Sequence, residues 1–286
     1  MIPYRIYLSG GGVTVSAHIG ALQELSKHIS LQTVKEWMGV SAGGFISMCL
    51  CIGYTLEELE EFCLNFDFNH IKEVDSIPGL VLNYGLDTGD RLYRMITACL
   101  HIKGLSSEFT FKECLEKYNI SLRIVATDLN KGKPFICNPY DTPDYSIANA
   151  IRASMSVPLY YQPFVCPETG HFLVDGAVIS NYPLFVLSKE EQARTLSILI
   201  RTSMEPKETI EFEEYLLRPL SILYMHKMEM ESTFYSGHCI QIMLGQINIM
   251  DFSLTKEVKE ETIQKGKEAV LSYMKILPRV KRRNSL

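Results

Sequence analysis

The feature that most constrains this chain is a short turn motif near its amino end. Residues 39–43 read Gly-Val-Ser-Ala-Gly, the pattern G-x-S-x-G. An apolar run at Trp37 and Met38 precedes the motif, and a helix pattern of small residues follows it over residues 42–51. A sharp strand-to-helix turn crowds the backbone, so the positions two before and two after the serine have to be small. Such a turn exposes the Ser41 hydroxyl at the positive end of the following helix, where a serine can become a nucleophile.

Taken alone, the motif is weak evidence, and an ordinary turn that opens a buried helix is the favoured interpretation. A second unit of the same kind precedes it in the chain. Residues 5–8 form a short β-type run that stops at Gly10-Gly11-Gly12, and a helix pattern continues to about His28. Strand, glycine-rich turn and helix are the beginning of a parallel α/β layer. In such sheets the turns gather at the carboxyl ends of the strands, where these folds place their sites.

The rest of the chain alternates strand and helix patterns, which predicts one α/β domain. Residues 67–89 are expected to form a loop, and Pro219 is expected to break the long helix over 212–235 early. Thr55 with Glu58 and Thr110 with Glu113 predict capping boxes. The other expected helices are 90–102, 146–155 and 258–277, and the expected strands are 122–127, 133–137, 172–174 and 196–200.

Composition excludes several classes of function. A net charge of −5 argues against a nucleic-acid partner, because phosphate contacts need a basic face. The histidines and cysteines show no metal-ligand spacing, so neither a metal nor a cofactor is expected. The eight cysteines contain no C-x-x-C and mostly lie in apolar runs, which predicts free, buried thiols in a reducing compartment. The amino end lacks the layout of a secretory signal. The uncharged run at 37–56 is rich in Gly and Ser and is explained better by a buried strand-turn-helix than by a membrane span. A cytoplasmic location is therefore expected.

Three chemical groups fall at strand ends: Gly10-Gly11-Gly12, Ser41 and Asp175. Acyl transfer needs a nucleophile, a base and N–H donors for the oxyanion, and consecutive glycines leave their N–H groups accessible. A dinucleotide site is disfavoured because Val15 occupies the third glycine position of G-x-G-x-x-G. A Ser-Asp-His hydrolase would need a histidine after the acid, and His226 or His238 could serve. Both histidines lie in helix-like or mixed surroundings, which favours a structural role for them.

Several blocks of the chain resemble the patatin-like phospholipases, especially their bacterial branch. The blocks run in the family's order from about residue 4 to residue 190, and the resemblance fades beyond residue 200. They are Leu-Ser-Gly-Gly-Gly at 8–12 with Ala-His-Ile-Gly-Ala-Leu at 17–22, the G-x-S-x-G motif, Ala-Thr-Asp-Leu-Asn-Lys-Gly-Lys at 126–133, Ala-Ile-Arg-Ala-Ser-Met-Ser-Val-Pro at 150–158, and Val-Asp-Gly-Ala at 174–177 with Asn-Tyr-Pro at 181–183.

The resemblance implies a three-layer α/β/α sandwich around a mostly parallel sheet. It assigns residues 1–200 to the catalytic domain and leaves 201–286 as a helical part packed on the same domain. It implies a lipid acyl hydrolase of the phospholipase A or lysophospholipase type, with fatty-acyl esters of glycerolipids as substrates. By resemblance, Ser41 is the nucleophile, Asp175 is the base of a dyad without histidine, and Gly10, Gly11 and Gly12 form the oxyanion hole. We expect burial to raise the pKa of Asp175, since an ordinary carboxylate is a weak base at neutral pH.

The sequence departs from the family pattern just after the glycines. Thr14 stands where the family usually has Arg or Lys, and Val15 stands where it usually has Gly. The loss of this positive charge motivates an alternative hypothesis, a catalytically weak or inactive protein that binds or scaffolds lipids.

Two segments suggest peripheral contact with a membrane. The apolar residues of 67–89 could form a lid or a wall for the acyl chain, or simply pack on the core. In the last helix, Ile263, Val270, Met274 and Leu277 form one stripe beside a basic tail at 279–286. This stripe could press on an anionic bilayer, but a helix that faces the core is the favoured interpretation. The sequence contains no signal for an oligomeric state.

Overall fold

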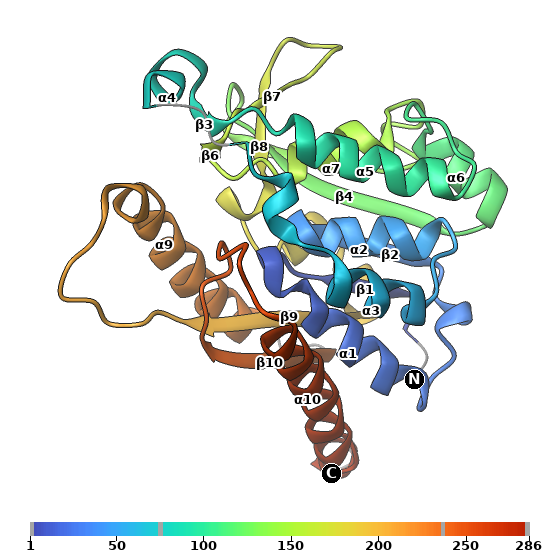
Figure 1. Ribbon diagram of the computed structural model, residues 1–286. Helices are drawn as coiled ribbons and strands as arrows, with labels where there is room; N and C mark the ends of the chain where they lie inside the picture. Colours follow the sequence, from blue (N-terminus) through green and yellow to red (C-terminus); the bar gives the residue numbers. More distant parts are fainter. Residues whose placement is uncertain (1–2, 74–76, 236–237, 284–286) are drawn as a thin grey trace.

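The computed structural model describes residues 3–73, 77–235 and 238–283, and it describes the side chains of these residues except for 77–79, 213 and 277–283. A sheet with the strand order β10-β9-β1-β2-β4-β8-β7 forms its centre, and β5 pairs with the far end of β4 (Figure 1). Neighbouring strands are parallel from β10 to β4, whereas β5, β7 and β8 are antiparallel. The expected mostly parallel sheet is confirmed. Its strands are β1 (Arg5–Leu8), β2 (Glu36–Val40), β4 (Ser121–Asp128), β5 (Lys133–Cys137), β7 (Phe164–Val165), β8 (Phe172–Asp175), β9 (Thr195–Ser203) and β10 (His238–Gln246).

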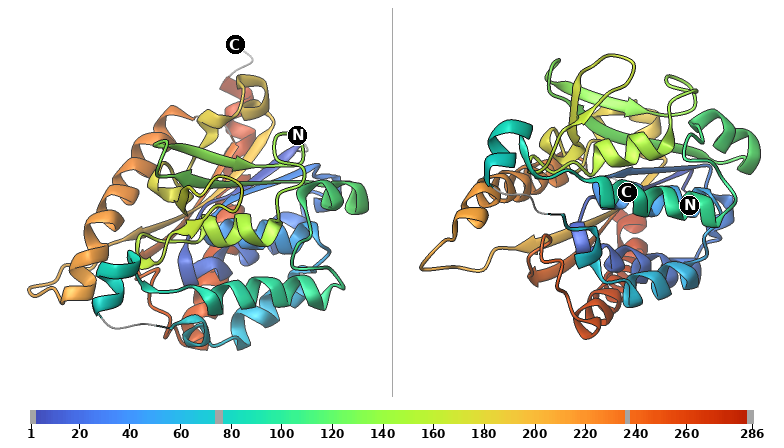
Figure 2. Two further views of the ribbon diagram at one scale, coloured as in Figure 1. Left: turned by 90° about the horizontal axis from the view of Figure 1, so that it is seen from above. Right: turned by 45° about the horizontal axis from the view of Figure 1, so that its top comes forward.

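Alternating side chains of the central strands build two separate cores, which makes the fold three-layered. On β1, Ile6 and Leu8 belong to the larger core, whereas Tyr7 belongs to the smaller one on the opposite face. Helices cover both faces (Figure 2). The larger core is covered by α1 (Ser16–Ser26), α2 (Ser41–Cys51), α3 (Leu56–Asn65), α5 (Asp90–Ile102), α6 (Phe111–Tyr118), α7 (Ile147–Ser154) and α10 (Lys256–Arg283), and the smaller core by α9 (Phe212–Phe234) with the 3₁₀ segment Leu184–Val186.

Local signals in the sequence are mostly confirmed. The two capping boxes form at the start of α3 and α6, where Thr55 and Thr110 accept the N–H groups of Glu58 and Glu113. All eight cysteines are free thiols, and seven of them are buried. Within the described ranges, no helix combines the length and the apolar character that crossing a bilayer would take.

Residues 67–73 and 77–89 are more ordered than a loop, so the expectation for these residues was wrong; residues 74–76 of this region lie outside the described residues. The region contains the 3₁₀ turn Phe68–Ile71, the helix α4 (Ile77–Asn83) and the strand β3 (Gly85–Asp87). Pro78 stands in the first turn of α4, where its missing N–H breaks no helical hydrogen bond. β3 pairs in parallel with β6 (Leu159–Tyr161) in a separate small sheet. This partner lies far away in the chain, so no local pattern could predict it.

The expected break at Pro219 was also wrong, because α9 runs through this residue as one helix. Packing of α9 on the sheet through residues such as Met228 outweighs the local preference of proline. The strand β10 was not predicted at all. Its alternation of buried Ile240, Ile242 and Leu244 with exposed Gln241 and Met243 is the usual pattern of a half-buried strand.

The last helix packs against the first, as the favoured interpretation of its apolar stripe requires. Ile263 and Val270 are buried, and Met274 is partly buried against the same core. Gly20 and Gly266 permit the close approach, because a Cβ at Gly20 would lie 1.9 Å from the Ile263 carbonyl oxygen. The side chains of Leu277 and of the basic tail at 279–286 lie outside the described residues. Because α10 packs on α1 and β10 joins the main sheet, we propose that residues 201–286 belong to the same domain.

Candidate active site

Ser41 occupies the sharp turn between β2 and α2 that the motif predicts. Its φ of 53° is in the left-handed region, which a residue with a side chain rarely adopts. The flanking glycines are sterically required. A Cβ at Gly39 would lie 2.5 Å from the Gly44 nitrogen, and one at Gly43 would lie 2.3 Å from the Ser9 carbonyl oxygen. The turn is therefore held against the end of β1, where the glycine-rich loop begins.

A serine on α7 holds the strained turn in place. The Ser154 hydroxyl accepts the Ser41 N–H at 2.8 Å and donates to the Val125 carbonyl oxygen at 2.7 Å. Ser154 is fully buried. It therefore satisfies the Ser41 N–H at the bend and ties the nucleophile turn to strand β4.

The sheet register brings Asp175 next to Ser41. Val40, the last residue of β2, pairs with Val125 on β4, and β4 continues to Asp128. The antiparallel strand β8 pairs with this extension and returns, so that Asp175 lies opposite Ala126. Because β8 pairs with β4 on the same side as β2, just beyond the end of β2, Asp175 lies next to the serine turn although β8 runs in the opposite direction. The chain bends away at Gly176, where a Cβ would lie 2.2 Å from the Val125 carbonyl oxygen.

The carboxylate of Asp175 is buried and has few polar partners. It accepts the Ala177 N–H at 2.8 Å and interacts with the Ser41 hydroxyl. Burial raises the pKa of Asp175 from 3.8 to about 6, and these two hydrogen bonds offset only part of that effect. The expected increase in the pKa is confirmed. A carboxylate with a pKa near 6 is a stronger base than an ordinary one and is still ionised at neutral pH.

The three glycines beside Ser41 are not equivalent. The Gly10 N–H donates to the Asn181 side-chain oxygen at 2.7 Å, and Asn181 in turn donates to the Gly10 carbonyl at 3.2 Å. The N–H groups of Gly11 and Gly12 have no acceptor among the residues described. Gly12 has a φ of 52°, and a Cβ there would lie 2.0 Å from the Ile249 carbonyl oxygen, so the loop after β10 presses on this position. Two of the three glycines thus present free donors, and Asn181 holds the first.

The departures at Thr14 and Val15 face the interior. Both side chains are buried, and the Thr14 hydroxyl donates to the Gly11 carbonyl at 2.7 Å. The buried His18 contributes from below, with its Nε2 2.8 Å from the Ser9 carbonyl oxygen. Burial lowers the pKa of His18 to about 4, so this imidazole is neutral and donates to the carbonyl. The glycine loop is therefore fixed by side chains beneath it.

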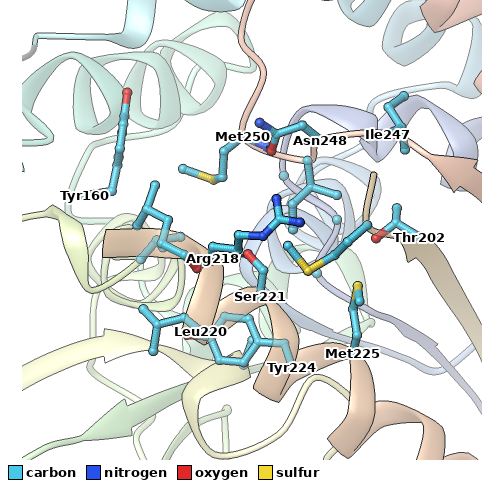
Figure 3. Close-up of a pocket in the computed structure, with 18 of the residues that line it drawn as sticks. Tyr160, Thr202, Arg218, Leu220, Ser221, Tyr224, Met225, Ile247, Asn248 and Met250 are labelled. Carbon is cyan, nitrogen blue, oxygen red and sulfur yellow. Dashed lines mark hydrogen bonds between the residues drawn. The ribbon is translucent and has the colours of Figure 1, made fainter. Parts of the chain in front are cut away.

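A cavity of about 430 Å³ connects these groups. Gly10–Gly12, Ser41 and Asp175 line it. Much of the rest of its lining comes from α9 and from the loops after β9 and β10 (Figure 3). The α9 wall combines the apolar Leu217, Leu220, Met225 and Met228 with the polar Glu214, Arg218, Ser221 and Tyr224. In the described part of the chain no histidine lines the cavity. His226 is exposed on α9, and His238 lies 3.0 Å from the Tyr273 hydroxyl, so neither meets the requirement of a Ser-Asp-His triad.

Comparison with known proteins agrees with this arrangement. The family model described as Patatin-like phospholipase matches residues 6–188, which is more than half of the chain. The chain belongs to the patatin-like phospholipase family. Membership in the family implies a lipid-ester hydrolase. The matched region contains Gly10–Gly12, Ser41 and Asp175 of the cavity lining. The α9 wall lies beyond it.

Individual relatives share less than 30% sequence identity with this chain. Uncharacterized protein YqhO of Bacillus subtilis (strain 168) is 28% identical over 93% of this chain and 96% of that protein. Probable lipid hydrolase 463L of Invertebrate iridescent virus 6 is 29% identical over 64% of this chain, and the match spans 63% of that viral protein. The solved structure of VipD from Legionella pneumophila has a TM-score of 0.66 at 15% identity, covering 96% of this chain and 67% of that one. This last likeness shows a shared fold.

Sequence reasoning missed the residues that hold the patatin-like site in shape. Ser154 and Asn181 both lie in blocks that resemble the family, but their hydrogen bonds to Ser41 and Gly10 join segments more than a hundred residues apart. The α9 wall had no signal beyond an apolar helix pattern. These contacts are tertiary, so a local motif cannot specify them.

The first prediction concerns the stability of the fold. Folding raises the pKa of Asp175, which means that the folded state favours the protonated carboxyl over the ionised one. The contribution of the protonated carboxyl to the free energy of unfolding is fully present below about pH 4 and is lost as the pH rises through about 6. A shift of this size corresponds to about 3 kcal/mol. Asp175→Asn keeps an oxygen for the Ala177 N–H and removes the charge. We expect its free energy of unfolding to exceed that of the wild type by up to about 3 kcal/mol at pH 8.

Urea denaturation at pH 4 and pH 8 measures this difference, and the excess should disappear at pH 4. The matched control is Asp144→Asn, which neutralises an exposed carboxylate. An Asp175→Asn variant that is no more stable than the wild type at pH 8 would contradict the buried, ionised carboxylate.

Proposed function

We propose that this protein hydrolyses fatty-acyl esters of glycerolipids, as a phospholipase A or lysophospholipase, through a dyad of Ser41 and Asp175. One observation carries the proposal. The hydroxyl of a serine in a strained turn meets a buried carboxylate of raised pKa in a cavity whose wall includes Leu217, Leu220, Met225 and Met228. A nucleophile, its base and space for an acyl chain are then in one place.

In the first step, the Ser41 oxygen attacks the ester carbonyl carbon while Asp175 takes the hydroxyl proton. The carbonyl oxygen becomes an anion. When the tetrahedral intermediate collapses, the bond to the leaving alcohol breaks and Asp175 returns the proton to that alcohol. The lyso product leaves, and the acyl group remains bonded to Ser41.

The oxyanion is assigned to the N–H groups of Gly11 and Gly12, with the amino end of α2 adding its dipole. Gly10 was also expected to donate, but its N–H is engaged by Asn181. In this proposal Gly10 and Asn181 keep the loop in position. The positive charge that the family usually has at position 14 would be buried here, where Thr14 instead bonds to the loop.

In the alternative hypothesis, the cavity binds a lipid but the protein does not hydrolyse it. This hypothesis is motivated by Thr14 and Val15. The raised pKa of Asp175 and the strained turn at Ser41 favour the enzyme, because a binding protein gains nothing from either feature.

Turnover of a short-chain p-nitrophenyl ester separates the two proposals. We expect Ser41→Ala to reduce turnover to the background rate. For the wild type, kcat/KM should fall about tenfold per pH unit below about pH 6, because protonated Asp175 cannot accept the serine proton. The control is Ser47→Ala, a serine on α2 whose hydroxyl bonds to the Gly43 carbonyl. Turnover that survives in Ser41→Ala would contradict the dyad. So would a kcat/KM that stays constant from neutral pH down to about pH 5 and falls only below that value.

We further propose that the mouth of the cavity contacts the lipid surface. Exposed apolar side chains stand on α4 and at the start of α9, two helices on the same side of the molecule (Figure 1). Val81 and Leu82 of α4 are 73% and 74% exposed, and Phe212 and Tyr215 of α9 are 53% and 64% exposed. Lys72, Lys207 and Arg218 line the same cavity together with Glu205, Glu211 and Glu214, and Lys207 is paired with Glu214 at 2.7 Å. The apolar groups, rather than a net positive charge, therefore suit this surface to a bilayer interface.

Leu82→Glu combined with Tyr215→Glu tests this contact. Placing two acids at the interface should weaken binding to phosphatidylcholine–phosphatidylserine vesicles at least about tenfold and leave turnover of the soluble ester unchanged. Ile276→Glu, an exposed position on α10 far from the mouth, is the matched control. Deletion of 279–286 tests the basic tail separately. Unchanged vesicle binding by the double variant would reject the mouth as the contact surface, and a loss on deletion would assign the contact to the tail.

A further inference from the structure

One buried polar group beside the candidate dyad has no partner. Tyr224 comes from α9, beyond the segment that matches the family, and lines the same cavity as Ser41 and Asp175 (Figure 3). Its hydroxyl oxygen is inaccessible to solvent and has no hydrogen-bond partner in the described part of the chain. Buried hydroxyls are nearly always satisfied, so an unsatisfied one at a site calls for a ligand, a substrate group or a water.

An acceptor that lines the same cavity and interacts electrostatically with Tyr224 is the carboxylate of Asp175. Burial and the negative charge of Asp175 together raise the pKa of Tyr224 well above its usual range, so the phenol keeps its proton. The Tyr224 hydroxyl makes no hydrogen bond to the carboxylate, whose partners are the Ala177 N–H and the Ser41 hydroxyl. A donor and an acceptor therefore border the same cavity without a direct hydrogen bond between them.

The chemistry of the Tyr224 hydroxyl and the Asp175 carboxylate restricts which group can bridge them. The bridging group has to accept a proton from Tyr224 and donate one to Asp175. An ester or carbonyl oxygen only accepts, so the lipid ester cannot satisfy both sides. A water molecule can, and so can the hydroxyl of a small alcohol. Once Ser41 is acylated, its hydroxyl no longer occupies Asp175, and the carboxylate is free for this second partner.

We propose that Tyr224 holds the water that hydrolyses the acyl-enzyme. The proposal rests on the function proposed for Ser41 and Asp175. Tyr224 donates to one lone pair of the water, and Asp175 accepts one of its protons. The second lone pair is then free to attack the acyl carbon. Tyr224 itself neither gains nor loses a proton.

The step balances without any other reactant. The water oxygen bonds to the acyl carbon while one water proton passes to Asp175. The tetrahedral intermediate then collapses, the bond from carbon to the Ser41 oxygen breaks, and Asp175 returns the proton to that oxygen. The products are a fatty acid and the free serine. The acylation step uses Asp175 on Ser41 directly, so it does not require Tyr224.

Tyr224→Phe separates the two steps, because it keeps the ring and removes only the hydroxyl. With a p-nitrophenyl ester under pre-steady-state conditions, we expect acylation to proceed at the wild-type rate, the burst amplitude to be at least as large as in the wild type, and the steady-state rate to fall about tenfold. Intact-protein mass spectrometry should then find the acyl group accumulating on Ser41. Hydroxylamine, a small nucleophile that needs no positioned water, should restore turnover in the variant more than in the wild type. Tyr140→Phe, an exposed tyrosine that does not line the cavity, is the matched control.

Two results would overturn the assignment of Tyr224 alone. One is a variant that turns over at the wild-type rate without accumulating acyl-enzyme. The other is a burst and a steady-state rate that fall by the same factor, which would mean that the hydroxyl acts before deacylation or supports the fold. Absence of turnover and of Ser41 acylation in the wild type would instead overturn the proposed function and this proposal together.

Discussion

The close contact between two strand-to-helix turns is the constraint on which the rest of the site depends. The turn at Ser41 packs so tightly against the end of β1 that a single methyl group at Gly43 would meet the Leu8 and Ser9 carbonyl oxygens. This contact forces the serine into a left-handed conformation and places the glycine loop beside it. Strain of this kind persists only where the surroundings over-determine it. Here Ser154 supplies the hydrogen bond that keeps the turn from relaxing.

The second requirement is a carboxylate that the fold buries at some loss of stability. Asp175 reaches its place because β4 is longer than β2, which leaves an extension for the antiparallel strand β8. The chain then accepts a buried acid with only two hydrogen bonds. The same burial that destabilises the ionised form raises its pKa into the range useful for a base. Stability and the proposed reactivity are thus two consequences of one environment.

Much of this arrangement could be predicted from the sequence, because steric requirements leave local marks. The glycines around Ser41, the glycines after β1 and the Asp175-Gly176 turn are short patterns with few physical explanations. The role of Asn181, the pairing of β3 with β6 and the continuous helix through Pro219 depend on segments distant in the chain. Strand β10 is different, since its alternation was present in the sequence and was overlooked. The cavity wall on α9 could not be predicted, because an apolar helix pattern does not reveal which core it faces.

The most direct test of the central claim is covalent trapping of the nucleophile. A long-chain alkyl fluorophosphonate reacts with a serine only where a base and oxyanion donors activate it. Tandem mass spectrometry of the labelled protein should find one phosphonate per chain, on Ser41, with labelling faster at pH 8 than at pH 5. Labelling of Ser41 that is unaffected by Asp175→Asn, or label on another residue, would contradict an activated Ser41–Asp175 pair.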